Sequence, residues 1–214
     1  MNPNDLVSDG HGNKIPFKYH AKENYIHHCG SLENLKIHWT THPQCMATER
    51  VRPLIHGRVI EVGVNYGNTA IMAASWPEVT EVLAIDINAN ALQACAELAT
   101  KAGVAGKMTF QVVNWAEACW VFSAYDVFMC HHTLEHIFSE DVDAFVKNSA
   151  NSLKRGGIAL VTVPHLTCHN SPEHVVLYDE KKLAETFGRH GLVAESCRVY
   201  GGGSIDGIFR KGTE

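Results

Sequence analysis

Four side chains of the kinds that bind metals are spaced so that one fold could bring them together. His132, Glu135 and His136 lie at positions i, i+3 and i+4, directly after an apolar run. If a helical turn begins at Thr133, this spacing places all three on one face. Two imidazoles and a carboxylate suit a divalent cation such as Mg²⁺, Mn²⁺, Fe²⁺ or Zn²⁺. The predicted ligands are these three residues and, from a later loop, His174.

The same cluster also allows an interpretation without a metal. Glu135 and His136 could brace the start of a helix, and the candidate general base would then be His136 or His165, because the pKa of an imidazole lies near neutrality. His131, at the end of the apolar run, is expected to line a cofactor pocket. Four histidines near the amino terminus are expected to lie at the surface: His11, His20, His27 and His28.

A second group of residues predicts a nucleoside pocket. The run Glu61-Val62-Gly63-Val64-Asn65-Tyr66-Gly67 follows a short strand, and its glycines allow a tight turn and a close ligand approach. Asp86 ends the next strand about twenty residues after the glycine turn, where a carboxylate can accept both hydroxyls of a ribose. In a parallel sheet both features lie at the carboxyl edge, so we expect them to be neighbours.

The elements that must position these residues alternate between strands and helices. Strands are expected at 58–62, 82–85, 108–113, 125–130 and 158–163, and a closing hairpin at 193–200 and 205–210. Helices are expected from 68 or 69, with Asn68 or Thr69 as the cap, and at 89–102, 141–153 and 179–190, the third ended by Gly156 and Gly157. Continuous apolar strands between helices predict a mainly parallel sheet covered on both faces.

Composition narrows the class of protein. The 214 residues are 45% hydrophobic and 19% charged, with a net charge of -5, which fits a soluble globular protein and disfavours nucleic acid as a partner. The apolar stretches are too short to cross a bilayer, and the amino-terminal residues do not form a signal peptide. Seven cysteines without a C-x-x-C pair favour a reducing cytoplasm over a disulfide framework.

At the glycine turn the chain resembles the class I S-adenosylmethionine-dependent methyltransferases, whose first motif is an acidic residue followed by glycines at alternate positions. Asn65 stands where a glycine is commonest in that motif. The resemblance implies that the loop holds the amino-acid part of the cofactor, and that Asp86 holds the ribose. In the glycine loop and at the end of the next strand, the resemblance implies these cofactor-binding residues: Glu61, Gly63, Asn65, Gly67, Asp86 and Ile87.

The resemblance continues over about residues 58 to 210. The segment 110–117 is similar to the one that contacts adenine in the family, with Asn114 in place of the usual Asp and Trp115 available for stacking. The strand 125–130 and the Leu153-Lys154-Arg155-Gly156-Gly157 turn before the strand 158–163 are further matches. The family has a Rossmann-like, doubly wound sheet of seven strands, mainly parallel, with a C-terminal antiparallel hairpin.

The cluster at residues 132–136 resembles the Glu-x-x-Glu-His motif of the metal-dependent branch of the family. This branch includes ubiquinone-biosynthesis O-methyltransferases and small-RNA 2′-O-methyltransferases. His132 stands in place of the first Glu, which weakens the case for Mg²⁺ and admits softer ions. Residues 1–55, which lack clear periodicity, are interpreted as a cap or lid over a catalytic domain at 56–214.

Together these features predict an enzyme that transfers a methyl group from S-adenosylmethionine to a hydroxyl of a small molecule, with a divalent metal. One alternative is a metal-free methyltransferase that uses a histidine base on an oxygen or nitrogen acceptor. A Rossmann-type oxidoreductase is disfavoured, because the loop fits a pyrophosphate poorly. A non-catalytic nucleotide-binding module is a further alternative, and the sequence decides neither the acceptor nor the oligomeric state.

Overall fold

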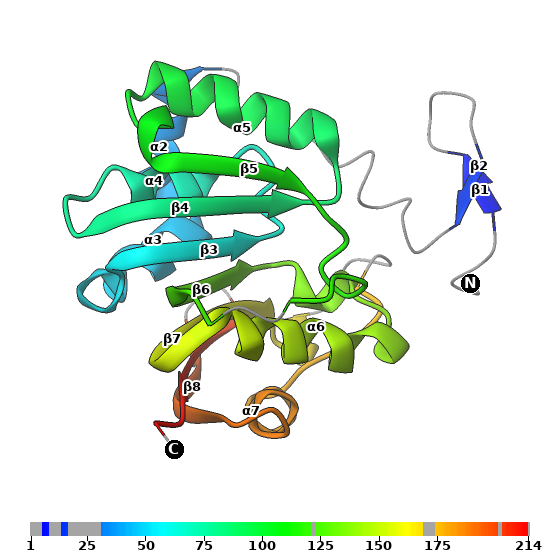
Figure 1. Cartoon of the computed structure of the whole chain (residues 1–214). Coiled ribbons are helices and arrows are strands. Elements are labelled where there is room, and N and C mark those ends of the chain that lie inside the picture. Colours follow the sequence, from blue (N-terminus) through cyan, green and yellow to red (C-terminus); the bar gives the residue numbers. More distant parts are fainter. Residues whose placement is uncertain are drawn as a thin grey trace.

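The computed structural model describes residues 6–8, 14–16, 31–120, 123–168, 174–200 and 203–213. Its main sheet has seven strands in the order β5-β4-β3-β6-β7-β9-β8 (Figure 1). Five of them are parallel: β3 (Gly57–Val62), β4 (Val79–Asp86), β5 (Met108–Val112), β6 (Tyr125–His131) and β7 (Leu153–Pro164). β9 (Ser204–Lys211) is antiparallel to both β7 and β8 (Leu192–Tyr200). The expected mainly parallel sheet with a closing antiparallel hairpin is therefore confirmed.

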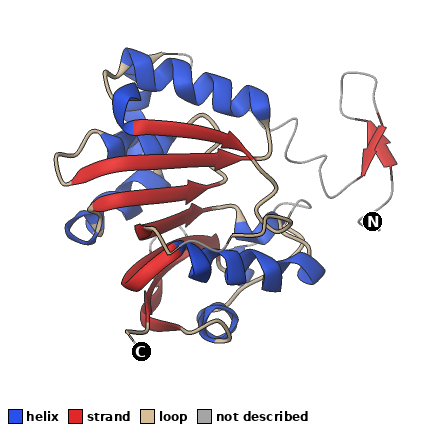
Figure 2. Ribbon diagram, viewed as in Figure 1, coloured by secondary structure: helices blue, strands red, loops and turns tan. Residues whose placement is uncertain are grey.

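Helices cover both faces of this sheet, as Figure 2 shows. One face carries α2 (Leu32–Thr41), α3 (Pro43–Arg50), α4 (Asn68–Ala74) and α5 (Ala89–Lys101). The other face carries α6 (Ser139–Ser152) and α7 (Glu180–Gly188). The short 3₁₀ turns are η1 (Arg52–Leu54), η2 (Ala105–Lys107), η3 (Leu134–His136) and η4 (Leu166–Cys168). β1 (Leu6–Ser8) and β2 (Lys14–Pro16) form a separate antiparallel pair.

Alternation along the strands divides the core into two layers. Val59 of β3 packs into the layer under α2–α5, while its neighbour Ile60 packs into the layer under α6 and α7. Phe128 and Met129 of β6 divide in the same way. Because successive side chains of a strand point to opposite faces, a strand covered on both sides must be apolar throughout. This requirement explains the continuous apolar runs by which the strands were predicted.

Three details differ from the sequence prediction. The cap of α4 is Gly67, in the left-handed region at φ 85, and neither Asn68 nor Thr69 caps the helix with its side chain. α6 ends at Ser152, and β7 begins at the next residue, so Gly156 and Gly157 lie inside a strand and do not stop a helix. Within residues 1–55, helices α2 and α3 form where no periodic pattern predicted them.

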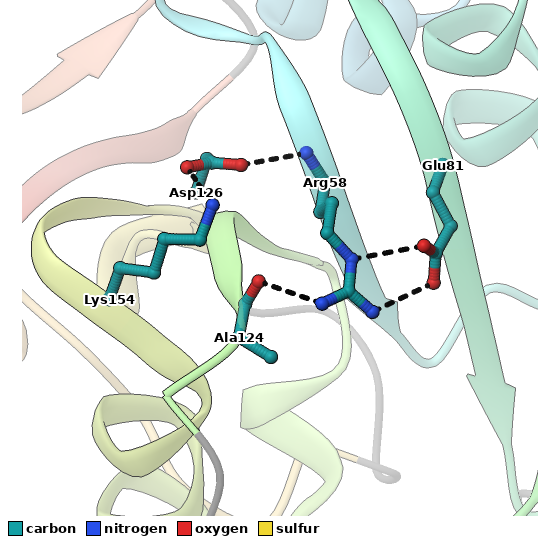
Figure 3. Close-up of polar contacts among 5 residues, drawn as sticks. All are labelled: Arg58, Glu81, Ala124, Asp126 and Lys154. Carbon is teal, nitrogen blue, oxygen red and sulfur yellow. Dashed lines mark hydrogen bonds and ion pairs between the residues drawn. The ribbon is translucent and has the colours of Figure 1, made fainter.

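The amino ends of the strands are tied together by polar contacts (Figure 3). The Arg58 guanidinium donates to both carboxylate oxygens of Glu81 on β4, at 3.0 and 3.1 Å, and to the Ala124 carbonyl at 3.3 Å. The Asp126 carboxylate of β6 accepts from the Arg58 backbone N–H at 2.8 Å and from the Lys154 ammonium at 2.6 Å. These contacts join β3, β4, β6 and β7 at the end opposite the glycine loop, so this end has a structural role.

The amino-terminal region is described in part. Its helices pack on the main sheet through Leu35 of α2 and Cys45 of α3, both fully buried in the layer under α2–α5. The histidines predicted to be at the surface, at positions 11, 20, 27 and 28, lie outside the described residues. In the described ranges, no helix combines the length and the apolar character that crossing a membrane requires.

Candidate functional site

The loop between β3 and α4 turns sharply, as its glycines allow. Gly63, Asn65 and Gly67 all have positive φ, at 79, 50 and 85. Asparagine is one of the few residues with a side chain that tolerates this region, which explains how Asn65 can stand in a glycine position. A Cβ on Gly63 would lie 2.1 Å from Oγ1 of Thr133, so the loop needs glycine there to pass the end of β6.

Asp86 fixes this loop from the neighbouring strand. One of its carboxylate oxygens accepts from the Asn65 backbone N–H at 2.8 Å, and the other accepts from the Asn88 backbone N–H at 2.9 Å. These two hydrogen bonds hold the carboxylate at the wall of the first cavity. The glycine loop and the strand-ending carboxylate are therefore in direct contact, as the sequence predicted.

Two cavities open on either side of the loop. The first has a volume of about 120 Å³, and seven of its fourteen lining residues have apolar side chains. Its lining residues are Val62, Gly63, Asn65, Asp86, Ile87, Ala91, Val113, Asn114, Trp115, His132, Thr133, His136, Ile137 and Phe145. The predicted nucleoside residues Asp86, Ile87 and Asn114 thus share one cavity.

Trp115 contributes to the first cavity from the core. Its side chain is buried, packs against Trp120 and Phe128, and donates from Nε1 to the Ser149 hydroxyl at 3.1 Å. These contacts hold the indole in one orientation at the wall of the cavity. Gly67 lines neither of the two cavities, and its positive φ contributes to the turn of the loop.

The second cavity is larger, about 430 Å³, and is mostly polar. Its lining residues are His42, Pro43, Gln44, Glu61, Gly63, Val64, Asn65, Tyr66, Asn68, Thr69, His131, His132, Glu135, His136, His174 and Ser204. It meets the first cavity at Gly63, Asn65, His132 and His136, which line both. A ligand could therefore extend from one cavity into the other past the glycine loop.

Glu61 is a buried carboxyl group at the wall of the second cavity. One oxygen accepts a short hydrogen bond from the Thr69 hydroxyl, and the other has no hydrogen-bond partner in the described structure. Burial raises the pKa of Glu61 to about 8, with the Thr69 hydrogen bond acting in the opposite direction. The group is therefore mostly protonated at neutral pH until a cation approaches.

His131 is a buried neutral imidazole that joins the sheet to α3. Thr48 of α3 donates its hydroxyl proton to the Gln44 carbonyl at 2.8 Å, so its oxygen accepts from Nε2 of His131 at 3.3 Å. Nδ1 of His131 then accepts from the Thr162 hydroxyl of β7 at 3.0 Å. Burial, with a smaller contribution from the nearby His132, lowers the pKa of His131 to about 3. His131 thus lines the second cavity as an uncharged side chain.

Three of the four predicted metal ligands come together. One ligand atom each of Glu135, His136 and His174 lies within 4.8 Å of the other two. The backbone carbonyl of Glu135 accepts from the N–H groups of Val175 and Val176, at 2.9 and 3.2 Å, and this contact brings the neighbouring His174 to the cluster. The rings of His136 and His174 stand edge to face, with centroids 5.1 Å apart.

Glu135 is the buried member of this group, with 1% of its surface exposed. Neither carboxylate oxygen has a hydrogen-bond partner among the described residues. Oε1 lies 3.3 Å from Nδ1 of His132 and 3.9 Å from Nε2 of His136. Burial alone would raise the pKa of Glu135, but these two imidazoles outweigh burial and lower it. The carboxylate therefore stays charged in the second cavity.

The remaining predicted site residues lie at the margin of the group of three or outside the two cavities. His132 has a left-handed backbone at φ 49 and lies beside the group of three, outside the 4.8 Å cluster. His165 lines neither of the two cavities; its Nδ1 contacts the Thr167 hydroxyl at 2.6 Å, and its Nε2 lies 3.5 Å from Glu180.

Sequence reasoning missed several residues of the second cavity. They are His42, Gln44, Tyr66, Asn68, Thr69 and Ser204. Asn68 and Thr69 follow the glycine loop directly, so their position next to Glu61 could have been inferred from the strand–turn–helix pattern. The proline at the start of α3 marks a helix beginning and could have placed His42 at its entry.

Comparisons with known proteins agree with this geometry. Residues 59–157 match the family model described as a methyltransferase domain. A search of curated protein sequences found no match. Many solved structures share the fold, at sequence identities too low to carry more than the fold.

Three of these structures illustrate the likeness. The YcgJ protein from Bacillus subtilis has 16% identity and a TM-score of 0.65, and the alignment covers 78% of this chain and 98% of that one. Magnesium protoporphyrin IX methyltransferase from Synechocystis, solved with bound S-adenosylhomocysteine, has 15% identity, a TM-score of 0.64 and coverages of 78% and 82%.

The third is a protein from Haloferax volcanii solved in complex with the Trm112 methyltransferase activator. It has 13% identity and a TM-score of 0.70, with coverages of 86% and 93%. The methyltransferase domain match over residues 59–157, the shared fold and the cavity at the carboxyl edge together support an S-adenosylmethionine-dependent methyltransferase.

Proposed function

We propose that this methyltransferase acts on a hydroxyl group of a small molecule, assisted by a divalent cation bound to Glu135, His136 and His174. The observation that carries the proposal is the convergence of these three side chains in the cavity that adjoins the nucleoside pocket. A charged carboxylate with no hydrogen-bond partner, buried beside two imidazoles, fits a cation better than it fits an empty polar core.

The residues of the first cavity fit the adenosine part of S-adenosylmethionine. Asp86 and Asn114 line this cavity, where a carboxylate can accept from the ribose hydroxyls and a side-chain amide can pair with the adenine amino group. Ile87 and Trp115 add apolar surface to the wall of the same cavity. The sulfonium would then lie near Gly63 and His136, where the two cavities meet.

The proposed cation would be held directly by Glu135, His136 and His174, with Mn²⁺, Fe²⁺ and Zn²⁺ suiting the two imidazoles better than Mg²⁺ does. A bound cation of this kind lowers the pKa of an attached hydroxyl, as it does for bound water. The protein's own part is to orient the acceptor, to exclude water and to fix the Glu135 carboxylate through its contact with His132. Methyl transfer needs no further covalent step by the protein.

A metal-free reaction is the second candidate, and one observation favours it. His136 lines both cavities, so its imidazole lies where a methyl donor and an acceptor would meet. It could remove the proton of an oxygen or nitrogen acceptor as a general base. His165, the other candidate base, lies outside both cavities and is not part of this proposal.

We also propose that α2 and α3 select the acceptor and that the enzyme works in the cytoplasm. His42, Pro43 and Gln44 form one wall of the second cavity, which supports the interpretation of the amino-terminal region as a cap. The net charge of -5 favours a small molecule over RNA. The six cysteines of the described ranges are free thiols, which is consistent with a reducing compartment.

The decisive experiment measures metal content and methyl transfer together. Elemental analysis of the purified protein is compared with the variants His136→Ala and Glu135→Gln, and with His56→Ala, an exposed histidine outside both cavities, as the matched control. Transfer from labelled S-adenosylmethionine is then followed over a panel of hydroxyl and amine acceptors, with and without a chelator. Metal content unchanged in His136→Ala removes the cation site, and turnover that survives chelation but not His136→Ala supports the metal-free reaction.

A further inference from the structure

A third cavity lies at the amino ends of β3, β6 and β7, opposite the glycine loop. Its volume is about 290 Å³. Ordinary pockets for small ligands begin at about 300 Å³, so the cavity has room for more than an inorganic ion. It shares no lining residue with the first or the second cavity. The third cavity is therefore separate from the site proposed for methyl transfer.

Positive side chains predominate in the wall of the third cavity. Lys154, Arg155 and Arg210 line it, against one carboxylate, Asp126. The chain as a whole has 18 lysines and arginines against 23 acidic residues, so this local balance is the reverse of the overall one. A cleft lined mainly by one sign of charge concentrates the electric field and attracts ions of the opposite sign. The ligand that suits this wall is an anion.

Two of the three cations already have partners. The Lys154 ammonium donates to the Asp126 carboxylate at 2.6 Å (Figure 3). The Arg210 guanidinium pairs with both carboxylate oxygens of Glu195, which lies outside the cavity, and donates to the Gly156 carbonyl at 2.8 Å. The single acidic group in the wall is thus neutralised by Lys154, and the two partnered cations are fixed in place.

Arg155 is the cation that the chain leaves unneutralised. It is exposed, and its guanidinium has no hydrogen bond or ion pair with any residue in the described part of the chain. Its charge acts on a neighbour, because burial and then Arg155 lower the pKa of the Lys211 ammonium. A guanidinium presents a planar fork of N–H donors that matches two oxygens of a phosphate. Arg155 is therefore equipped to pair with such a group from solution.

The remaining wall offers surface for a larger ligand than phosphate alone. Pro53 and Leu54 bring apolar side chains, and the exposed imidazole of His56 adds a polar group. The backbone beside Arg155 is also open: a Cβ on Gly156 would meet nothing nearer than a side-chain atom of Thr213 at 3.8 Å. The combination of a free guanidinium with apolar surface fits a small molecule that carries a phosphate next to an apolar part.

We propose that the third cavity binds an organic phosphate, whose phosphate group pairs with the Arg155 guanidinium and whose apolar part contacts Pro53 and Leu54. Lys154 and Arg210 contribute positive potential while their own partners hold them in position. A ligand bound there contacts the end of the sheet opposite the cofactor loop. The proposal depends neither on the cation at Glu135 nor on the identity of the methyl acceptor.

Calorimetric titration of the full chain with phenyl phosphate tests this site, because the probe carries a phosphate on an apolar ring. For Arg155→Ala we expect the affinity to fall by about ten-fold or more, since the variant removes a charged hydrogen-bonding partner. The matched control is Arg198→Ala, which removes the same charge from an exposed position of β8 outside the cavity. The control should keep the affinity within about two-fold of the wild type. Inorganic phosphate should bind more weakly than phenyl phosphate, because it lacks the apolar part.

Two further measurements separate the third cavity from the proposed active site. Saturation with S-adenosylhomocysteine should leave the affinity for phenyl phosphate unchanged, because the cavities share no lining residue. Nuclear magnetic resonance should show that phenyl phosphate shifts the amide signals of Gly156 and Gly157 and not that of Gly63. Equal losses in Arg155→Ala and Arg198→Ala would mean attraction to net charge only and would overturn the proposal. Displacement of phenyl phosphate by S-adenosylhomocysteine, or no binding by the wild type at millimolar concentration, would overturn it as well.

Discussion

The imidazole of His132 is held between Glu135 and the strand β9. Its Nδ1 lies 3.3 Å from Oε1 of Glu135, and its Nε2 lies 3.3 Å from the Ser204 hydroxyl. Both ring nitrogens are thus engaged, and the residue is outside the group of three whose ligand atoms lie within 4.8 Å of one another. We infer that His132 orients Glu135 and does not itself bind the proposed cation.

This arrangement predicts different metal affinities for two neighbouring histidines. His132→Ala should weaken binding of Mn²⁺ by about 10- to 100-fold, the usual cost of losing a group that orients a ligand. His136→Ala should abolish binding, because it removes a ligand atom. Ser204→Ala, which removes only the contact to Nε2 of His132, should have the smallest effect. The measurement is titration of metal-stripped protein, and complete loss of binding in His132→Ala would make that residue a direct ligand.

A second prediction concerns the backbone of the glycine loop. Asn65 has φ 50, and its side chain accepts from the Tyr66 backbone N–H at 2.9 Å. Asn65→Gly should change the free energy of unfolding by less than about 0.5 kcal/mol, because glycine adopts this conformation freely. Asn65→Ala should cost about 1 kcal/mol and Asn65→Val more, because a Cβ without a local hydrogen bond disfavours positive φ. Urea unfolding of the three variants checks the order, and equal values for Gly and Val would contradict it.

The sheet and its two-sided cover could be predicted because they depend on local patterns. Central strands such as β4 and β7 contain continuous apolar runs, and turn residues separate the strands from the next helices. α2 gave no such signal, since Leu35 is its only buried residue and one apolar position makes no periodic stripe. The predicted cap of α4 was wrong because the residue before the helix is a left-handed Gly67, and no asparagine or threonine side chain caps the helix.

The site was predictable where residues directly follow strands. Glu61, Asp86 and His131 lie at strand ends, so a parallel sheet places them at one edge. Ser204 and His42 could not be placed in this way. Ser204 meets His132 only because β9 inserts between β7 and β8, and His42 reaches the cavity only through the packing of α2 and α3. Such contacts depend on tertiary arrangement, for which a single sequence has no periodic signature.

The hydrogen bond between Thr48 and His131 predicts a measurable link between α3 and the sheet. Thr48→Val keeps the shape of the side chain but leaves Nε2 of the buried His131 without its acceptor, which should lower the free energy of unfolding by about 1–3 kcal/mol. Thr48→Ser keeps the hydroxyl and should lose less than about 1 kcal/mol. Denaturant unfolding distinguishes the two, and a larger loss for Thr48→Ser than for Thr48→Val would show that the methyl group, not the hydroxyl, matters.

A last prediction follows from the buried carboxyl group of Glu61. Its pKa in the folded protein is raised to about 8 from an ordinary value of 4.5, so the fold favours the protonated form. The stabilisation from this group is complete below pH 4.5 and is lost as the pH rises through 8. Each pKa unit corresponds to about 1.4 kcal/mol, so the loss is on the order of a few kcal/mol. The buried thiols Cys95 and Cys130 nearby have raised pKa values and stay neutral over this range.

Glu61→Gln isolates this effect, because the amide cannot ionise while every other titrating group is retained. The difference in unfolding free energy between Glu61→Gln and the wild type should be small at pH 5 and should grow in favour of the variant up to pH 9. Glu97→Gln, an exposed position on α5, serves as the matched control and should show no such trend. A difference that stays constant with pH would mean that Glu61 ionises as readily in the folded chain as in the unfolded one, and the cavity wall would then be wetter than the buried carboxyl group implies.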